Sequence, residues 1–311
     1  MGAVSQERVL RGGAASEPWG GVARVVGAGL LWGTTGTAQA LAPPGTYPLG
    51  LGAARLIVGG GALLALAFRR GALSRPERRD WIRIALAAAC MAAYQPLFFA
   101  GVGRAGVAVG TLVGLGSAPV VAGLLDGLRR RRWPGGRWTV ATALAIVGCA
   151  LLAGVAEGGG TTDPVGIALA IGAGAAYASY TVVNKEMVAR YRPEALTAIT
   201  FALAALLLSP ALLTGPREWL VQARGVAVVL HLGLVATAAA YLLFVRGLAS
   251  LPAPTATTLS LSEPVTAAVL GMVVLGERLT ALSWVGALAV AAAIVVLAWA
   301  EGSRADATHR T

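Results

Sequence analysis

The stretch WGTT at residues 32–35 has a counterpart later in the chain in YASY at residues 177–180. The aromatic residues that begin the two stretches are 145 positions apart, and the same interval separates Pro119 from Pro264. Each proline lies late in a long apolar run. An interval that recurs in this way indicates an internal duplication, with two related units following one another along the chain.

The chain is far more apolar than a soluble protein. Of its 311 residues, 57% are hydrophobic and 13% are charged, and the mean hydropathy is +0.72. A soluble globular domain carries about 25% charged residues, so most of this chain must face lipid or other apolar segments. The net charge of +11 could suggest nucleic acid, but the arginines lie in short segments between apolar runs, where membrane topology places them. We therefore expect contacts with membrane lipids and no nucleic-acid partner.

Apolar runs of about 20 residues, the length a helix needs to cross a bilayer, occur ten times. They must be helices, because an open strand in lipid leaves its backbone groups unsatisfied. The expected spans lie near 21–42, 49–68, 82–102, 107–128, 138–156, 165–185, 195–214, 226–246, 253–275 and 283–300. This predicts a first five-helix repeat over 21–156 and a second over 165–300. A disordered N-terminal segment (1–20) and a C-terminal tail (301–311) flank them.

The basic residues predict the orientation of these spans. With a cytoplasmic N-terminus, 20 of the 25 Lys and Arg residues fall on the cytoplasmic side, four fall outside and Arg55 lies within a span. This asymmetry follows the positive-inside rule and places both termini in the cytoplasm.

Five spans per half is an odd number, so the second unit is inverted relative to the first. The sequence thus predicts an all-α integral membrane protein of ten transmembrane helices, built as two inverted five-helix repeats. Transporters often have this design, with the substrate site near the bilayer midplane between the repeats. We expect Pro119 and Pro264 to bend spans 4 and 9 beside a cavity lined by spans 1, 2, 4, 6, 7 and 9.

Several motifs resemble the EamA-type members of the drug/metabolite transporter superfamily. They are Trp32-Gly33, Ala54-Arg55, residues 256–264, LGERL at 275–279 and WVG at 284–286, and the likeness extends over nearly the whole chain. The resemblance implies a ten-helix solute transporter, with many relatives exporting amino acids, other metabolites or drugs. The first half departs from the pattern, because Ala118 stands where the second half has Glu263.

Arg55 and Glu263 are the two charged residues expected at membrane depth. A charge facing lipid costs at least a few kcal/mol, so Arg55 should face the interior of the bundle. It then either contacts substrate or binds backbone carbonyls in a structural role. Glu263 directly precedes Pro264 and could carry protons, bind a cationic group, or be satisfied by neighbouring hydroxyls.

Aromatic and amide side chains deep in the spans complete the set of candidate substrate-binding residues. They are Trp32, Tyr94, Gln95, Tyr177 and Tyr241. Such rings can stack on a flat or cationic substrate, although core packing is an equally good account of Tyr94 and Tyr241.

Two further features stand near the expected span ends. Lys185 is the only lysine in the chain. It is expected to be an orienting charge near the cytoplasmic end of its span, with a gating role as the alternative. Trp133 and Trp138 are expected to anchor the interface.

Together these features favour a secondary transporter that exports a small organic solute across a bacterial inner membrane, with no enzymatic activity. No P-loop motif occurs, so ATP is not the direct driver. Cys90 and Cys149 lie in apolar runs without a partner motif, so we expect no disulfide, no metal and no cofactor. Translocation of a lipid or lipid-linked substrate is the alternative function. Monomer and homodimer both remain open.

Overall fold

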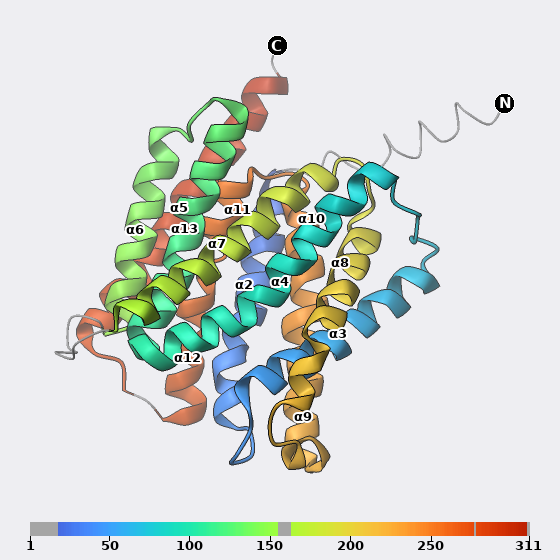
Figure 1. Cartoon of the computed structure of the whole chain (residues 1–311). Coiled ribbons are helices and arrows are strands. Elements are labelled where there is room, and N and C mark those ends of the chain that lie inside the picture. The colour runs from blue at the N-terminus through green and yellow to red at the C-terminus, as the bar shows by residue number, and fades with distance from the viewer. Residues whose placement is uncertain (1–17, 155–162, 277, 310–311) are drawn as a thin grey trace.

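The computed structural model describes residues 18–154, 163–276 and 278–309, and its elements over these residues are all helices (Figure 1). The expected disordered segment lies almost entirely outside the described residues, since the first helix begins at Pro18. The first half comprises α2 (Pro18–Ala40), α3 (Pro48–Arg69), α4 (Arg78–Ala105), α5 (Val107–Arg130) and α6 (Gly136–Leu152).

The second half has more interruptions than the first. It comprises α7 (Pro164–Met187), α8 (Pro193–Leu208) with the 3₁₀ turn η2 (Ser209–Leu213), the 3₁₀ turn η3 (Glu218–Val221), α9 (Ala223–Gly233), the π-helical segment η4 (Leu234–Ala239), α10 (Ala240–Leu248), α11 (Ala253–Leu259), α12 (Ser262–Leu275) and α13 (Ala281–His309). Expected span 8 is therefore α9, η4 and α10 in series. Expected span 9 is divided into α11 and α12, and α13 continues past residue 300 to His309.

Eight helical segments of the described chain are long and apolar enough to cross a membrane. They are Pro48–Arg69, Arg78–Ala105, Val107–Arg130, Pro164–Met187, Pro193–Leu213, Ala223–Leu248, Ala253–Leu275 and Ala281–Ser303. The prediction of a multi-span, all-α membrane protein is thus confirmed. Reaching ten requires two more helices: α6, which is apolar but only 17 residues long, and α2, which carries threonines and a glutamine towards its end. The number ten stays a prediction.

The contacts between helices repeat when the two halves are exchanged. In one set α4 and α5 pack on α7, and in the equivalent set α10 and α12 pack on α2. The second helices of the halves, α3 and α8, pack on each other, as do the last helices, α6 and α13. The first helices, α2 and α7, run in opposite directions (Figure 1). This pattern is what an inverted pair of five-helix units related by a pseudo-two-fold axis produces.

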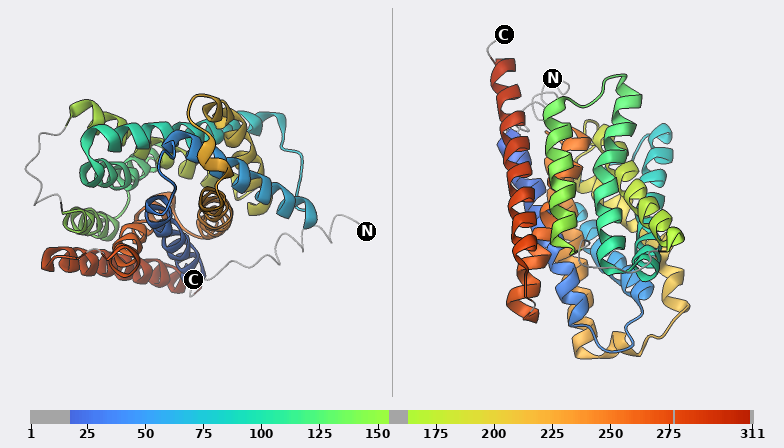
Figure 2. Two further views of the ribbon diagram at one scale, coloured as in Figure 1. Left: turned by 90° about the horizontal axis from the view of Figure 1, so that it is seen from below. Right: turned by 90° about the vertical axis from the view of Figure 1, so that its left-hand side faces the viewer.

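Glycines allow α6 and α13 to touch backbone to backbone, and the two helices lie side by side in both views of Figure 2. A Cβ atom on Gly148 would lie 2.7 Å from the carbonyl oxygen of Gly286, and a Cβ on Gly286 would lie 2.5 Å from that of Gly148. Small residues are how helices approach this closely in membranes.

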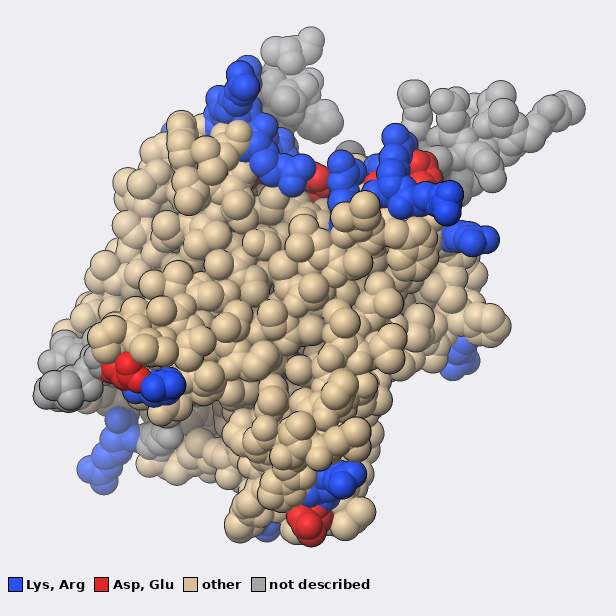
Figure 3. Space-filling model, in the orientation of Figure 1, with Lys and Arg blue, Asp and Glu red and all other residues tan. Residues whose placement is uncertain are grey.

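Lys and Arg side chains gather mainly at one end of the molecule, where α2 begins and α13 ends (Figure 3). We call this the basic end. There Asp80, at the start of α4, is 0% exposed and accepts hydrogen bonds from Arg83, Arg190 and Tyr191. Arg190 and Tyr191 follow α7, so this buried cluster ties the two halves together at the basic end.

Candidate functional site

The seven candidate substrate-binding residues lie around one cavity of about 60 Å³. This is room for roughly four water molecules, at about 15 Å³ each. The candidates that line it are Trp32, Arg55, Tyr94, Gln95, Tyr177, Tyr241 and Glu263. The structure therefore brings together residues that are spread over more than 200 positions of the chain.

The helices around the cavity differ in part from those expected. Lining residues come from α2, α3, α4, α5, α7, α10 and the region from Ser260 to Glu263. Span 7 was expected to contribute, but among the described residues α8 supplies none of the lining, whereas α4 and α10 do. The reason is packing: α8 lies behind α3, α4 and α10 and contacts all three.

Arg55 is held by the π-helical segment η4. Arg55 is 7% exposed, and its Nε donates to Thr237 Oγ1 at 3.1 Å while Nη2 donates to the Ala236 carbonyl oxygen at 3.2 Å. The Thr237 hydroxyl donates in turn to the Leu232 carbonyl at 2.8 Å. A π-turn inserts an extra residue into a helix and is frequent at functional sites. Here it supplies both acceptors for the arginine, one of them a backbone carbonyl.

Glycines bring α3 close enough to make these bonds. A Cβ on Gly59 would lie 2.6 Å from Thr237 Cγ2 and 2.8 Å from the Gly233 carbonyl, and one on Gly233 would lie 2.5 Å from Val58 Cγ1. Helix α3 and the end of α9 therefore pack closely, with a glycine at the contact on each helix. This close packing sets the depth at which the Arg55 side chain meets η4.

Glu263 lies in the first turn of α12, immediately after the break that separates α12 from α11. Its backbone N–H donates to the Ser260 carbonyl at 3.0 Å. Pro264 comes next and has no N–H to continue the helical pattern backwards, which accounts for an interruption at this point. The first half lacks this interruption, because α5 continues as one helix through Pro119. The two proline sites therefore differ in helix continuity, and the expected bends at Pro119 and Pro264 stay predictions.

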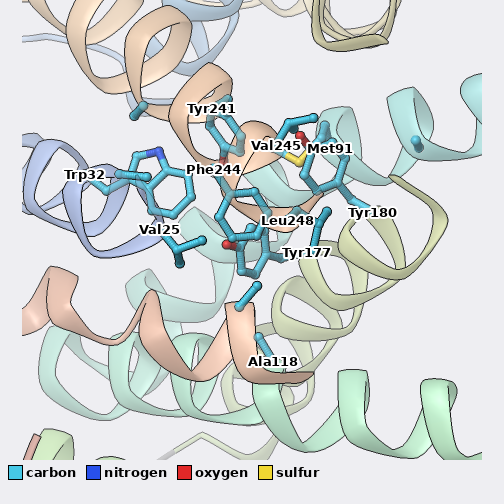
Figure 4. Close-up of a cluster of buried hydrophobic side chains, with 14 of the residues drawn as sticks. Val25, Trp32, Met91, Ala118, Tyr177, Tyr180, Tyr241, Phe244, Val245 and Leu248 are labelled. Atoms are coloured by element: carbon cyan, nitrogen blue, oxygen red, sulfur yellow. The ribbon is translucent and has the colours of Figure 1, made fainter. Parts of the chain in front are cut away.

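Aromatic side chains from α2, α7 and α10 gather beside the cavity in one cluster, here called the aromatic layer (Figure 4). The ring of Trp32 lies 6.0 Å from Tyr177, 4.8 Å from Tyr241 and 5.4 Å from Phe244, measured between centroids. Helices α7 and α10 run towards the basic end, so Tyr180 and Phe244, one turn beyond the lining tyrosines, lie on that side. Both are 0% exposed, so solvent reaches neither ring from that side.

Sequence reasoning missed several members of the site. Thr35 and Gln39 line the cavity on the same face of α2 as Trp32, at spacings of three and seven residues that a helical pattern could have revealed. Phe98 and Phe99 of α4 and Leu115 of α5 carry no polar signal that would distinguish them from core residues. Ser260, which the sequence places only within the motif at residues 256–264, also lines the cavity.

Comparisons with known proteins agree with this architecture. The model of the EamA-like transporter family matches residues 19–154 and again 164–299. "Uncharacterized transporter YwfM" of Bacillus subtilis is 42% identical over 284 residues, which cover 91% of this chain and 95% of that protein. "Threonine/homoserine exporter RhtA" of Escherichia coli K12 is 37% identical over 160 residues, about half of each chain.

A solved crystal structure has the same fold. It superposes with a TM-score of 0.77, covering 89% of this chain and 95% of its own, at 21% sequence identity. The family model matches both halves of the chain, and a relative called a transporter aligns over almost its full length. The fold has helices that can span a membrane. This chain is a member of the EamA-like transporter family.

Proposed function

We propose that this protein is a secondary transporter that exports a small zwitterionic solute of the amino-acid class by alternating access. The observation that carries the proposal is that Arg55 and Glu263 line the same cavity. A guanidinium is the favoured partner of a carboxylate, and a carboxylate is the natural partner of an ammonium group. The rings of Trp32, Tyr177 and Tyr241 offer further surfaces for a cation.

The two charges break the symmetry of the repeats. The position 145 residues after Arg55 is Thr200, and the position 145 residues before Glu263 is Ala118. The first half therefore contributes a positive charge and the second half a negative charge. A solute that carries both charges would bind in one orientation. The name of RhtA, which refers to threonine and homoserine, supports an amino acid as the class of solute for this chain.

The position of the cavity supports alternating access. Its lining lies towards the end opposite the basic end, since Arg55 is about 10 Å from the start of α3 at 1.5 Å per residue and Gln39 is near the end of α2. The aromatic layer and the Asp80 cluster close the other side. By the positive-inside rule the basic end is cytoplasmic, so this arrangement represents a state closed to the cytoplasm. Rocking of the halves about α2 and α7 would open that side to load the solute.

The chemistry of the lining favours a solute over a lipid. An arginine, a glutamate, two glutamines and hydroxyl groups from Thr35 and Ser260 line the cavity together with the aromatic rings. An acyl chain would leave these polar groups without partners, at a cost of about 1–3 kcal/mol for each.

The test is to compare metabolites in the medium of bacteria that overproduce the wild type or the Arg55→Ala, Glu263→Gln double variant, at equal amounts in the membrane. We expect an amino acid to accumulate outside only with the wild type. The control is Arg217→Ala, Glu218→Gln, which makes the same two chemical changes at exposed positions away from the cavity. Equal amino-acid profiles for the wild type and the double variant would overturn the proposal.

A further inference from the structure

A second cavity, of about 440 Å³, lies at the basic end. It is formed where α5, α7 and α10 end, where α6 and α11 begin, and where α13 passes them at Glu301. Its lining includes Arg130, Arg132, Trp133, Lys185, Thr255 and Glu301. It thus takes in the single lysine and a tryptophan that the central site leaves unused.

Two tryptophans of the lining pack against glycines of α5. A Cβ on Gly127 of α5 would lie 2.7 Å from the ring of Trp133, and a Cβ on Gly123 would lie 2.4 Å from the ring of Trp138. Both indoles therefore pack closely against glycine positions of the same helix, and both line the cavity. Anchoring at the membrane interface, the role expected for these residues, does not require such close packing against glycines.

Charged groups of both signs face the same space. Lys185 Nζ donates to the carbonyls of Leu248 and Ala249, at 2.9 and 3.1 Å, and an ammonium group has three N–H donors. Glu301 is 8% exposed, and its Oε1 accepts a hydrogen bond from Thr255 at 3.0 Å. The cavity therefore has a fixed cation and a fixed carboxylate on different helices, α7 and α13.

The same elements connect this cavity with the central one. On α7, Lys185 lines the outer cavity and Tyr177 the central one, eight residues or about 12 Å apart along the helix. Along α11, Thr255 faces the outer cavity and Ser260, just past its end, faces the central cavity. Thr257 and Thr258 between them are buried, at 0% and 1% exposure, so solvent reaches neither side chain between the two cavities.

We propose that the outer cavity is a loading site, which binds the zwitterionic solute from the cytoplasm before the central cavity receives it. The solute's carboxylate pairs with Lys185 and Arg132, and its ammonium group faces Glu301 and the indole of Trp133. This inference rests on the proposed function for the class of solute and for the direction of transport. It adds a second binding site with its own residues.

The test reports on this cavity directly. Ser250, which also lines it, is changed to cysteine in a full-length chain carrying Cys90→Ala and Cys149→Ala. Inside-out vesicles are treated with a membrane-impermeant maleimide, with L-threonine as the probe. We expect threonine to slow labelling at least threefold. Threonine methyl ester and N-acetylthreonine, which each lack one charge, should need about tenfold higher concentrations, as expected for the loss of one charged hydrogen bond.

Variants separate this site from the central one. Lys185→Met and the exposed Arg132→Met should each weaken protection about tenfold. Arg131→Met removes the same charge from the same turn, at a position outside the lining, and should leave protection unchanged. Arg55→Ala should abolish transport while protection persists.

The outcomes distinguish the two proposals. Protection without threonine transport would refute the proposed function and keep the site. Transport without protection would overturn the loading site, as would protection that Lys185→Met and Arg132→Met leave unchanged or that Arg55→Ala removes. Labelling that is slow without threonine, and becomes fast only when phosphatidylethanolamine is omitted from reconstituted vesicles, would assign the cavity to a lipid headgroup and also overturn it.

Discussion

Trp32 and Tyr177 meet ring edge to ring face at the centre of the molecule, with their centroids 6.0 Å apart and their planes at 90°. They occupy equivalent positions of the two repeats, 145 residues apart. Equivalent residues of a two-fold pair come into contact only near the symmetry axis. The contact therefore places the pseudo-two-fold axis between α2 and α7, beside the cavity that both residues line.

Replacing Arg55 by lysine should raise the KM for an amino-acid substrate about tenfold, although the charge is kept. A lysine ammonium is a compact point charge and cannot reproduce the planar fork that binds Thr237 and Ala236 while facing the cavity. The KM is measured by transport in proteoliposomes. Thr237→Ser, which keeps the hydroxyl, is the control and should behave like the wild type. A lysine variant with unchanged KM would show that the fork geometry is irrelevant.

Glu263→Gln should reduce transport at least a hundredfold while leaving the protein folded. The amide keeps the size of the side chain but can neither bind an ammonium group by charge nor carry a proton. Initial rates in proteoliposomes give the activity, and the thermal unfolding midpoint in detergent gives the stability, which should change by no more than a few degrees. Full transport by this variant would remove Glu263 from the mechanism.

Asp80→Ala should lower the free energy of unfolding by about 3 kcal/mol, because it leaves the groups that surround a buried carboxylate without their partner. Glu77→Gln is the matched control. Its side chain is 58% exposed and pairs with Arg79 and Arg190, so its removal should cost no more than about 1 kcal/mol. Equilibrium unfolding in mixed micelles measures both. Equal effects of the two changes would mean that the buried cluster does not hold the halves together.

Gly148→Ala should destabilise the protein by about 1–3 kcal/mol, since the added methyl group would lie 2.7 Å from the Gly286 carbonyl and force α6 and α13 apart. Gly61→Ala on α3 adds the same group where nothing lies within 4 Å. It should be neutral or slightly stabilising, because alanine favours a helix more than glycine does. Unfolding midpoints in detergent compare the two variants. A stable Gly148→Ala would mean that the two helices can separate at little cost.

The site candidates could be found from sequence because polar groups in apolar spans are expensive. Arg55, Gln95 and Glu263 each interrupt a run of apolar residues, so the bundle interior is the place where they can be satisfied. The partners of Arg55 were not accessible in this way. Thr237 and Ala236 lie in an ordinary apolar stretch, and no local sequence pattern predicts a π-turn there.

Lys185 shows the same limit at the basic end. Its position near the end of a span fits an orienting charge, and this interpretation requires no knowledge of the residues that contact it. Its contacts with the carbonyls of Leu248 and Ala249, more than 60 residues away, arise only because α7 ends beside α10. The cavity that it lines with Glu301 is therefore invisible to any local pattern.

The sequence by itself determined the class of fold and its duplication, since hydropathy, the 145-residue interval and the distribution of arginines depend only on how each residue partitions between water and lipid. Tertiary structure alone decided where α11 breaks from α12, which helices surround the cavity, and that Arg55 binds η4. Those features depend on contacts between residues far apart in the chain. Such contacts are set by the packing of glycine-lined helix faces, which has no one-dimensional signature.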